Sequence, residues 1–384
     1  MTVTTPAGFR AAGVACGLKS SGGLDLALVV NTGPLDSAAA VFTSNRAQAN
    51  PIIWSRQAIA DGRARAIVLN SGGANCFTGH QGFQTTHATA EAVAEQLSVG
   101  AGEVLVCSTG LIGEQLDRER LLAGVAAAAE ALTDDGGADA ARAIMTTDSV
   151  PKTAEHRDDA GWSIGGIAKG AGMLAPGLAT MLVVITTDAA LDSAALDRSL
   201  REATRLSFDR LDSDGCMSTN DQVTLMASGA SGVTPDEHDF TLALVDVCMS
   251  LALQLQRDAE GASHDIQIHV RGAASEDDAV EVGRSVARNN LFKAAIFGND
   301  PNWGRVLAAI GTTQAAFDPY DVDVTMNGVR VCTAGGPDRP RDEVDLSPRV
   351  VTLEIDLKSG SEAAMILTND LTHDYVHENS AYSS

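Results

Sequence analysis

One stretch near the middle of the chain joins a lysine, a run of small residues and a threonine. Lys169 is followed by Gly-Ala-Gly-Met-Leu-Ala-Pro-Gly-Leu-Ala, and Thr180 then opens the apolar run Met-Leu-Val-Val-Ile. A strained peptide bond before Thr180 can be attacked by the threonine hydroxyl in an N→O acyl shift, and hydrolysis then frees the α-amine. Such an amine has a reference pKa of about 7.7–8.0, so it can act as the base for its own hydroxyl near neutral pH. The pattern is typical of a self-processing nucleophile; an ordinary loop before a strand is the alternative.

Lys169 is unusual because the chain has few lysines and this one lies between an apolar run and a glycine turn. An ammonium group in that place can receive a substrate carboxylate. The alternative is a side chain that runs along apolar surface and keeps its charge in water.

Two predicted strands end in hydroxyl and glycine residues. Ser108-Thr109-Gly110 follows the apolar run Val104–Cys107, and Asn70-Ser-Gly-Gly-Ala-Asn75 ends another. A hydroxyl beside an unhindered backbone N–H suits an oxyanion hole, although a simple turn has the same composition. The polar strings 213–221 and 298–305 are predicted to be ordered rim loops.

Three other patterns are weak evidence for a metal or dinucleotide site. Asp212-Ser-Asp-Gly resembles the middle of a calcium loop, but Arg210 would take the first ligand position. His373 and His377 are four residues apart, with no further ligands nearby, so a surface pair is the simpler interpretation. Gly170-x-Gly172 lacks the third glycine of a dinucleotide site. No metal site and no bound cofactor are predicted.

The composition narrows the class of protein. Among 384 residues, 27 Lys and Arg face 50 Asp and Glu, a net charge of −23. This charge argues against nucleic acid or an anionic membrane as a partner, and the hydrophobic content of 45% excludes disorder. No run of about 18–20 apolar residues and no signal peptide is visible. The six cysteines are scattered without a C-x-x-C, so we expect a reduced, cytoplasmic protein.

Apolar periodicity predicts an α/β protein. Runs rich in Val, Ile and Leu predict strands at 24–31, 39–43, 66–70, 103–107, 162–168, 181–187, 222–227, 266–270, 292–297, 322–326, 350–356 and 363–368. Three- and four-residue spacing predicts helices at 86–97, 118–132, 138–145, 193–206, 240–259, 278–289 and 303–310. Because several strands follow one another without a helix between them, we expect mixed sheets with helices on their outer faces.

The segment from Lys169 to Leu182 closely resembles the cleavage motif of the ornithine acetyltransferase/glutamate N-acetyltransferase family of arginine biosynthesis. The family often has Pro-Asn before its Ala-Thr, where this chain has Pro-Gly-Leu; a glycine keeps the loop flexible, so cleavage is still expected. Other matching segments extend the resemblance over essentially the whole chain: Asn70–Asn75, Cys107–Gly113, Met145–Asp148, Phe208–Asp221, Phe297–Arg305 and Glu378–Ser384.

The resemblance implies the roles of individual residues. It makes Thr180 the nucleophile, with Thr109 and Gly110 as its oxyanion hole. Its substrate contacts match Thr146, Lys169, Thr180, Glu260, Asn379 and Ser384. It implies self-cleavage between Ala179 and Thr180, which would give an α chain of residues 1–179 with the oxyanion hole and a β chain of 180–384 with the nucleophile. It further implies an αββα-like sandwich and a heterotetramer of two α and two β chains.

The implied activity moves acetyl from N2-acetylornithine to glutamate through an acetyl-Thr180 intermediate, giving ornithine and N-acetylglutamate. The resemblance leaves open whether acetyl-CoA serves as a second donor. Two other functions remain as alternatives. A related self-processing hydrolase, such as an aminopeptidase, would release the acyl group to water, and an amino-acid sensor would use the same pocket without catalysis.

Overall fold

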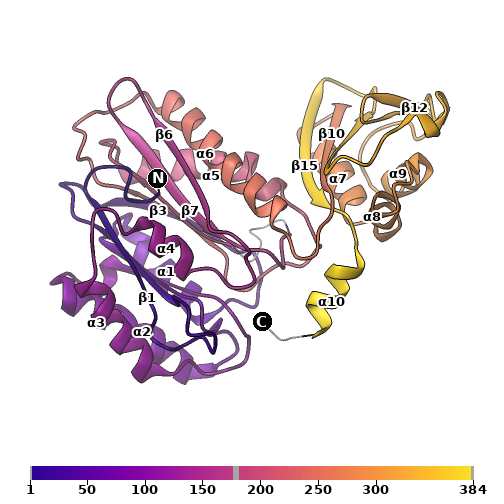
Figure 1. Cartoon of the computed structure of the whole chain (residues 1–384). Coiled ribbons are helices and arrows are strands. Elements are labelled where there is room, and N and C mark those ends of the chain that lie inside the picture. Colours follow the sequence, from indigo (N-terminus) through magenta and orange to yellow (C-terminus); the bar gives the residue numbers. More distant parts are fainter. Residues whose placement is uncertain (1, 176–180, 382–384) are drawn as a thin grey trace.

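The computed structural model describes residues 2–175 and 181–381, whose strands form three sheets (Figure 1). The first sheet has the order β1-β2-β4-β5 and comprises Phe9–Val14, Leu26–Asn31, Ala66–Asn70 and Val104–Ser108. The second has the order β3-β9-β8-β7-β6 and comprises Ser37–Phe42, Gln222–Ala227, Leu182–Thr187, Ser163–Lys169 and Lys152–Arg157. The third has the order β13-β12-β11-β14-β10-β15 and comprises Gly336–Pro337, Val329–Thr333, Asp323–Met326, Val350–Asp356, Asp265–Ala273 and Glu362–Asn369.

The first two sheets pack face to face. Leu69 and Leu105 of the first sheet share one buried cluster with Ile167, Leu182 and Val184 of the second. Helices cover the outer faces: α2 (Gly79–Leu97) and α3 (Arg118–Glu130) on the first sheet, α5 (Ser193–Leu206) and α6 (Glu237–Arg257) on the second. These four layers form a sandwich of mixed sheets with helices outside, in agreement with the fold class predicted from the sequence. Cleavage into two chains stays a prediction.

Two short helices complete the sandwich. α4 (Gly137–Ala143) packs against the first sheet near its β1 edge (Figure 1). α1 (Asn50–Ala58) covers the free edge of β5, where the Ser55 hydroxyl donates to Val106 O at 2.9 Å and accepts from Val106 N at 3.0 Å. Because a covered edge cannot pair with another strand, α1 protects the strand that ends at Thr109.

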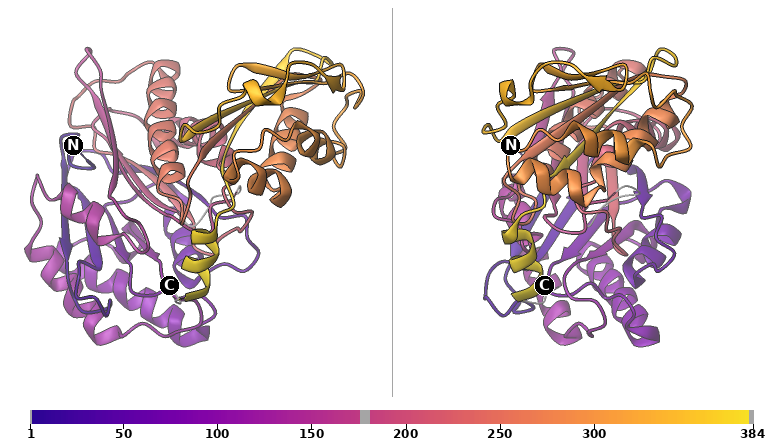
Figure 2. Two further views of the ribbon diagram at one scale, coloured as in Figure 1. Left: turned by 45° about the vertical axis from the view of Figure 1, so that its right-hand side comes forward. Right: turned by 90° about the vertical axis from the view of Figure 1, so that its right-hand side faces the viewer.

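A second unit forms beside the sandwich. All strands of the third sheet follow residue 264, and α7 (Glu276–Ala287), α8 (Asn290–Phe297) and α9 (Trp303–Ile310) pack against it (Figure 2). The last helix, α10 (His373–Ala381), returns to the sandwich (Figure 1). The predicted cleavage between residues 179 and 180 falls between β7 and β8, which are neighbours in the second sheet, and the division into α and β chains stays a prediction.

One predicted strand is wrong. Residues 292–297 form α8, in which Phe292 and Ile296, four residues apart, are both buried. Asn289 caps the helix by accepting from Phe292 N at 2.9 Å. A short apolar run fits either a strand or a buried helix, and the capping residue was the available signal. The prediction also missed α1, α10, β1, β6, β12 and β13.

α6 is long and apolar enough to pass for a membrane span by length and composition. Phe240, Leu244, Leu251 and Leu255, however, are fully buried in the cluster beneath the second sheet. These contacts account for its hydropathy as that of a core helix.

Candidate active site

Six of the predicted site residues line one small pocket of about 70 Å³, called here the small pocket. They are Thr109, Gly110, Thr146, Lys169, Glu260 and Asn379, and Thr147, Gly172 and Met173 complete the lining. They come from the end of β5, the loop after α4, the end of β7, the segment after α6, and α10. The other predicted positions, Ala179, Thr180 and Ser384, lie outside the described residues.

The turn after β5 is tightly built. Thr109 N donates to Asn70 O at 2.9 Å, and Gly73 N donates to Thr109 O at 2.9 Å. Gly110 has φ of 124°, and a Cβ there would lie 2.8 Å from Gly73 N, so only glycine fits. Among the described residues none accepts a hydrogen bond from Gly110 N–H. A backbone N–H of this kind is the donor that an oxyanion hole requires.

Lys169 is the last residue of β7 and is only 1% exposed, so the interpretation of a solvent-directed side chain is wrong. Its Nζ donates to Thr109 Oγ1 at 3.1 Å. Burial lowers the pKa of Lys169, and the charge of Asp148 opposes that shift. Because Thr109 Oγ1 accepts from the ammonium, its own hydrogen remains free to donate to a second group in the pocket.

Asp148 holds this end of the pocket together, and sequence reasoning gave it no role. Its Oδ1 accepts from Lys152 Nζ and from Gly170 N, both at 2.6 Å, and its Oδ2 accepts from Thr146 N at 3.0 Å. Burial by itself would raise the pKa of Asp148, but the charges of Lys169 and Lys152 and the Gly170 N–H outweigh it, so the pKa lies below its ordinary value. The one signal was its place in the matching segment Met145–Asp148.

A buried ion pair connects this cluster to α6. Lys152 is fully buried, and its Nζ also lies 2.5 Å from Oδ2 of Asp258, the residue that ends α6. Two residues further on, Glu260 N donates to Ala171 O at 3.0 Å, and Glu260 Oε1 accepts from the Thr147 hydroxyl at 2.7 Å. The same cluster therefore helps to fix the Glu260 carboxylate in the pocket wall.

Glu260 explains a glycine pattern that the sequence left without a function. A Cβ on Gly172 would lie 2.5 Å from Glu260 Oε2, closer than real Cβ contacts allow. The glycine at 172 thus makes room for the Glu260 carboxylate, while Gly170 contributes its backbone N–H to Asp148.

α10 closes the pocket from the C-terminal side. The Thr372 hydroxyl donates to Gly261 O at 2.6 Å, next to Glu260, and Asn379 Nδ2 donates to Tyr375 O within the helix at 3.0 Å. Asn379 is exposed on its helix and reaches the pocket lining. Its amide can both donate and accept, as the predicted contact requires.

A larger cavity of about 470 Å³ adjoins the small pocket and shares Thr147 and Glu260 with it. Asp374 and Glu378 of α10 line its far wall. Burial raises the pKa of Glu378, and the like charges of Glu260 and Asp374 add to the rise. Arg257 and Arg349 also line this cavity, so cations and carboxylates share its wall.

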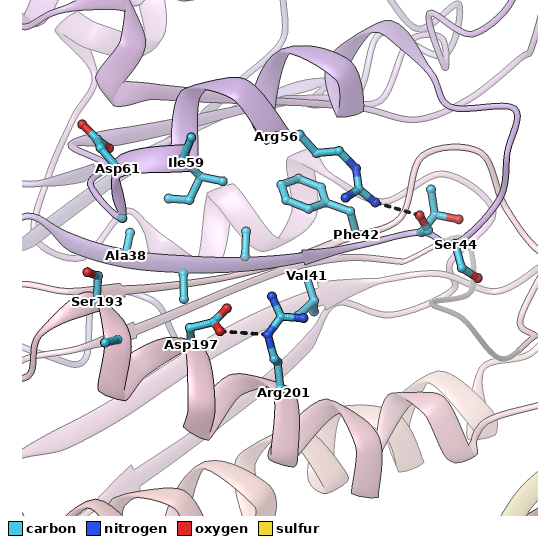
Figure 3. Close-up of a pocket in the computed structure, with 16 residues that line it drawn as sticks. Ala38, Val41, Phe42, Ser44, Arg56, Ile59, Asp61, Ser193, Asp197 and Arg201 are labelled. Atoms are coloured by element: carbon cyan, nitrogen blue, oxygen red, sulfur yellow. Dashed lines mark hydrogen bonds and ion pairs between the residues drawn. The ribbon is translucent and has the colours of Figure 1, made fainter.

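A cavity of about 650 Å³, larger than both of these, lies elsewhere (Figure 3). It runs along β3 between α1 and α5 and is called here the β3 groove. Its cations are already engaged: Arg56 Nη2 donates to Thr43 O at 3.1 Å, and Arg201 Nε donates to Asp197 Oδ2 at 2.8 Å (Figure 3). None of the predicted site residues lines it, so cavity size does not identify the site.

The other patterns weighed in the sequence have simple structural explanations. Asp212 Oδ2 accepts from Arg288 Nε at 2.7 Å, and Asp214 accepts from Cys216 N in a turn. His373 and His377 are exposed on α10. Within residues 2–175 and 181–381, no group of three or more His, Cys, Asp or Glu side chains could hold a metal ion.

Comparisons with known proteins show the family to which the chain belongs. The model of the ArgJ family matches residues 10–384. The arginine biosynthesis bifunctional protein ArgJ of Streptomyces coelicolor is 62% identical over 384 residues, and that of Thermobifida fusca is 59% identical, each alignment covering 100% of both chains. A solved chain of ornithine acetyltransferase complexed with ornithine, from Mycobacterium tuberculosis, is 55% identical. Its match covers 47% of this chain and 96% of that chain, with a TM-score of 0.45.

Proposed function

The chain belongs to the ArgJ family of arginine biosynthesis, and from that premise we propose that its small pocket transfers acetyl from N2-acetylornithine to glutamate. One observation carries the proposal. The buried Lys169 ammonium donates to Thr109 Oγ1, while the threonine hydrogen and the adjacent Gly110 N–H are left to stabilise a negative oxygen. Two donors beside a developing oxyanion are the main requirement of acyl transfer.

The first half of the reaction loads the enzyme. The Thr180 hydroxyl attacks the acetyl carbonyl, and the Thr180 α-amine takes its proton. The carbonyl oxygen becomes an oxyanion that accepts hydrogen bonds from Thr109 and Gly110. As the C–N bond breaks, the departing amine of ornithine takes the proton from the α-ammonium, and acetyl remains on Thr180.

The second half reverses these steps with another amino acid. The α-amine of glutamate attacks the acetyl ester, its proton passes to the Thr180 α-amine and then to the hydroxyl, and N-acetylglutamate leaves. One oxyanion hole serves both halves, because the attacking and departing amines use the same carbonyl carbon. Lys169 would neutralise a carboxylate of the bound amino acid, and Glu260 would receive an amino group.

The two products of cleavage are proposed to stay together as a heterotetramer of two α and two β chains in the cytoplasm. The pairing of β8 supports the association of one α chain with one β chain, since β8 hydrogen-bonds to β7 from the α side and to β9 within the β side. All six residues of β8 are buried, so separating the chains would expose core surface at about 25 cal/mol per Å². A native mass near twice 39.7 kDa, with two bands on denaturing electrophoresis, is the expected result.

The decisive experiment supplies the donor and the acceptor separately. Purified protein is mixed with N2-acetylornithine alone, and the 180–384 fragment should gain about 42 Da, the mass of one acetyl group. Glutamate added next should remove that mass and appear as N-acetylglutamate. Release of acetate instead would favour the hydrolase, and an intact chain with no mass gain would favour the sensor. Repeating the loading step with acetyl-CoA tests whether it is a second donor.

A further inference from the structure

Asn220 and Asp221 lie directly before β9, and each forms a hydrogen bond to one side of the site. The Asn220 amide donates to two carbonyl oxygens, Ala74 O at 2.7 Å and Ser108 O at 2.8 Å. Asp221 Oδ1 accepts from Met181 N at 3.1 Å. The dipeptide therefore contacts the residue before Thr109 and the residue after Thr180.

Both side chains are buried and held in a defined orientation. Asn220 is 4% exposed and Asp221 is fully buried. Asn220 Oδ1 accepts from the Thr219 hydroxyl at 2.6 Å, so every polar atom of this amide has a partner. The backbone is fixed as well, because Thr43 N donates to Asp221 O at 3.0 Å.

The hydrogen bonds of the Asn220 amide cross between the two sheets of the sandwich. β9 pairs in parallel with β8 in the second sheet, in the register Leu182↔Gln222, so Asp221 lies beside the start of the strand that Thr180 precedes. β5, which ends at Ser108, belongs to the first sheet. Asn220 is thus a polar connection from the second sheet to the first at the level of the pocket.

We infer that Asn220 and Asp221 are positioning residues that set the separation between the nucleophile strand β8 and the oxyanion strand β5. The inference rests on the proposed function. Asp221 fixes the first backbone N–H after the nucleophile, and Asn220 fixes the carbonyl that precedes Thr109. Neither side chain lines the small pocket, so both act through their neighbours. A displacement of about 1 Å between reacting groups can lower a rate by about 100-fold.

Asp221 needs only an oxygen acceptor for this role. Burial raises the pKa of Asp221 well above its ordinary value, with the Met181 N–H and the charge of Lys169 opposing the rise. A neutral carboxyl still accepts through its carbonyl oxygen. Asparagine offers the same acceptor at the same distance, so Asp221→Asn should rescue what Asp221→Ala loses.

The test compares Asp221→Ala, Asp221→Asn and Asn220→Ala with the control Asp188→Ala. Asp188 follows the other end of β8, is 6% exposed, and accepts from Ser163 N at 2.7 Å and Ala7 N at 3.0 Å. For each variant, self-cleavage is followed by electrophoresis, kcat and KM are measured on the cleaved enzyme, and thermal melting is recorded.

Both alanine variants at 220 and 221 should lower kcat or the rate of self-cleavage by about 10- to 100-fold, with KM changed less than about 2-fold. Asp221→Asn should recover most of the loss, and Asp188→Ala should lower the melting temperature alone.

If an alanine variant does not fold, Asn220→Gln keeps both donors but shifts them by one methylene, and the same fall in kcat is expected. Wild-type rates in both alanine variants would overturn the inference, as would an equal loss in Asp188→Ala. An inactive but cleaved wild type would instead contradict the proposed function.

Discussion

The small pocket and the β3 groove both contain cations, but they use them differently. In the pocket, buried Lys169 donates to the Thr109 hydroxyl, and beside the pocket buried Lys152 pairs with Asp148, whose carboxylate also accepts from Gly170 N–H. In the groove, the Arg201 side chain is 63% exposed and pairs with Asp197 four residues away on the same helix. The cations of the β3 groove are thus already paired. The small pocket, in contrast, keeps the Thr109 hydroxyl hydrogen and the Gly110 N–H without acceptors among the described residues. Hydrogen-bond donors that are held by buried contacts and have no acceptor among the described residues therefore identify the site better than cavity volume does.

The largest effect should come from the nucleophile itself. Thr180→Ala removes the hydroxyl that would attack both the Ala179–Thr180 bond and the acetyl group, so cleavage and transfer should both disappear. Scaling 39.7 kDa by chain length predicts wild-type bands of about 18–19 and about 21 kDa. The variant should give one band, and a wild type that stays as a single band would contradict self-processing.

Lys169→Ala tests whether the buried cation receives a carboxylate. Truncating one partner of a buried charge pair typically costs about 2–5 kcal/mol, so kcat/KM for N2-acetylornithine should fall by about 30-fold or more. Cleavage must be checked first, because position 169 is close in sequence to the scissile bond. Lys358→Ala is the matched control, since Lys358 is paired with Asp321 and Asp323 at the surface. Equal values of kcat/KM for the two variants would show that Lys169 does not receive the substrate carboxylate.

Thr109→Ala should act on the transition state rather than on binding. Loss of one oxyanion donor has lowered kcat by about 10²–10³ in a hydrolase, and KM should change little. Thr109→Ser keeps the hydroxyl and should keep most of the activity. Parallel double-reciprocal plots should accompany wild-type turnover; intersecting plots without a mass gain on the 180–384 fragment would indicate direct transfer in a ternary complex.

The buried and surface carboxylates should also differ in their effect on stability. Asp148→Asn leaves Lys152 with one charged partner, and breaking a buried pair costs about 3–5 kcal/mol, against about 0–1 kcal/mol for Asp197→Asn at the surface. The pKa of Asp148 is lowered in the folded state. Its contribution is therefore present above the unfolded value of about 4 and is lost as pH falls below it. Denaturation at pH 7 and at about pH 3 should show the difference between wild type and Asp148→Asn shrinking in acid.

Much of the fold could be predicted from apolar runs, because the strands β2, β4, β5, β7, β8 and β9 are buried along their whole length and are mostly apolar. β2 and β8 are examples, with all six residues of each buried. β6 was missed because Lys-Thr-Ala-Glu-His-Arg is an edge strand with mostly half-buried residues, which gives no apolar run. α10 was missed because none of its residues is buried, so it carries no apolar face.

The site residues, too, were predicted only where the sequence carries a recognisable motif. Motif resemblance found six residues that the structure brings together in the small pocket, and their roles remain predictions. It gave no role to Lys152 and Asp258, whose ion pair joins residues 106 positions apart, nor to Asn220, which lies in the matching segment Phe208–Asp221 and whose partner Ser108 is 112 positions away. These pairs depend on how elements far apart in the sequence meet, β6 with the end of α6 and the segment before β9 with the end of β5, and a single sequence carries no local pattern for that.

The smallest effect should come from the β3 groove. Arg201→Ala removes a cation that is exposed and already paired within α5, and such pairs contribute about 0.2–1 kcal/mol. We therefore expect kcat and KM within about 2-fold of wild type and a melting temperature that barely moves. The inner face of α5, with Leu196 and Leu200 fully buried, does not change in this variant, so the second sheet keeps its support. Kinetic assays and thermal melting measure both expectations. A clear change in kcat without a change in melting temperature would mean that the β3 groove is coupled to the small pocket through β3 and β9. The distinction between a groove whose cations are already paired and a pocket that keeps donors for a ligand would then no longer hold.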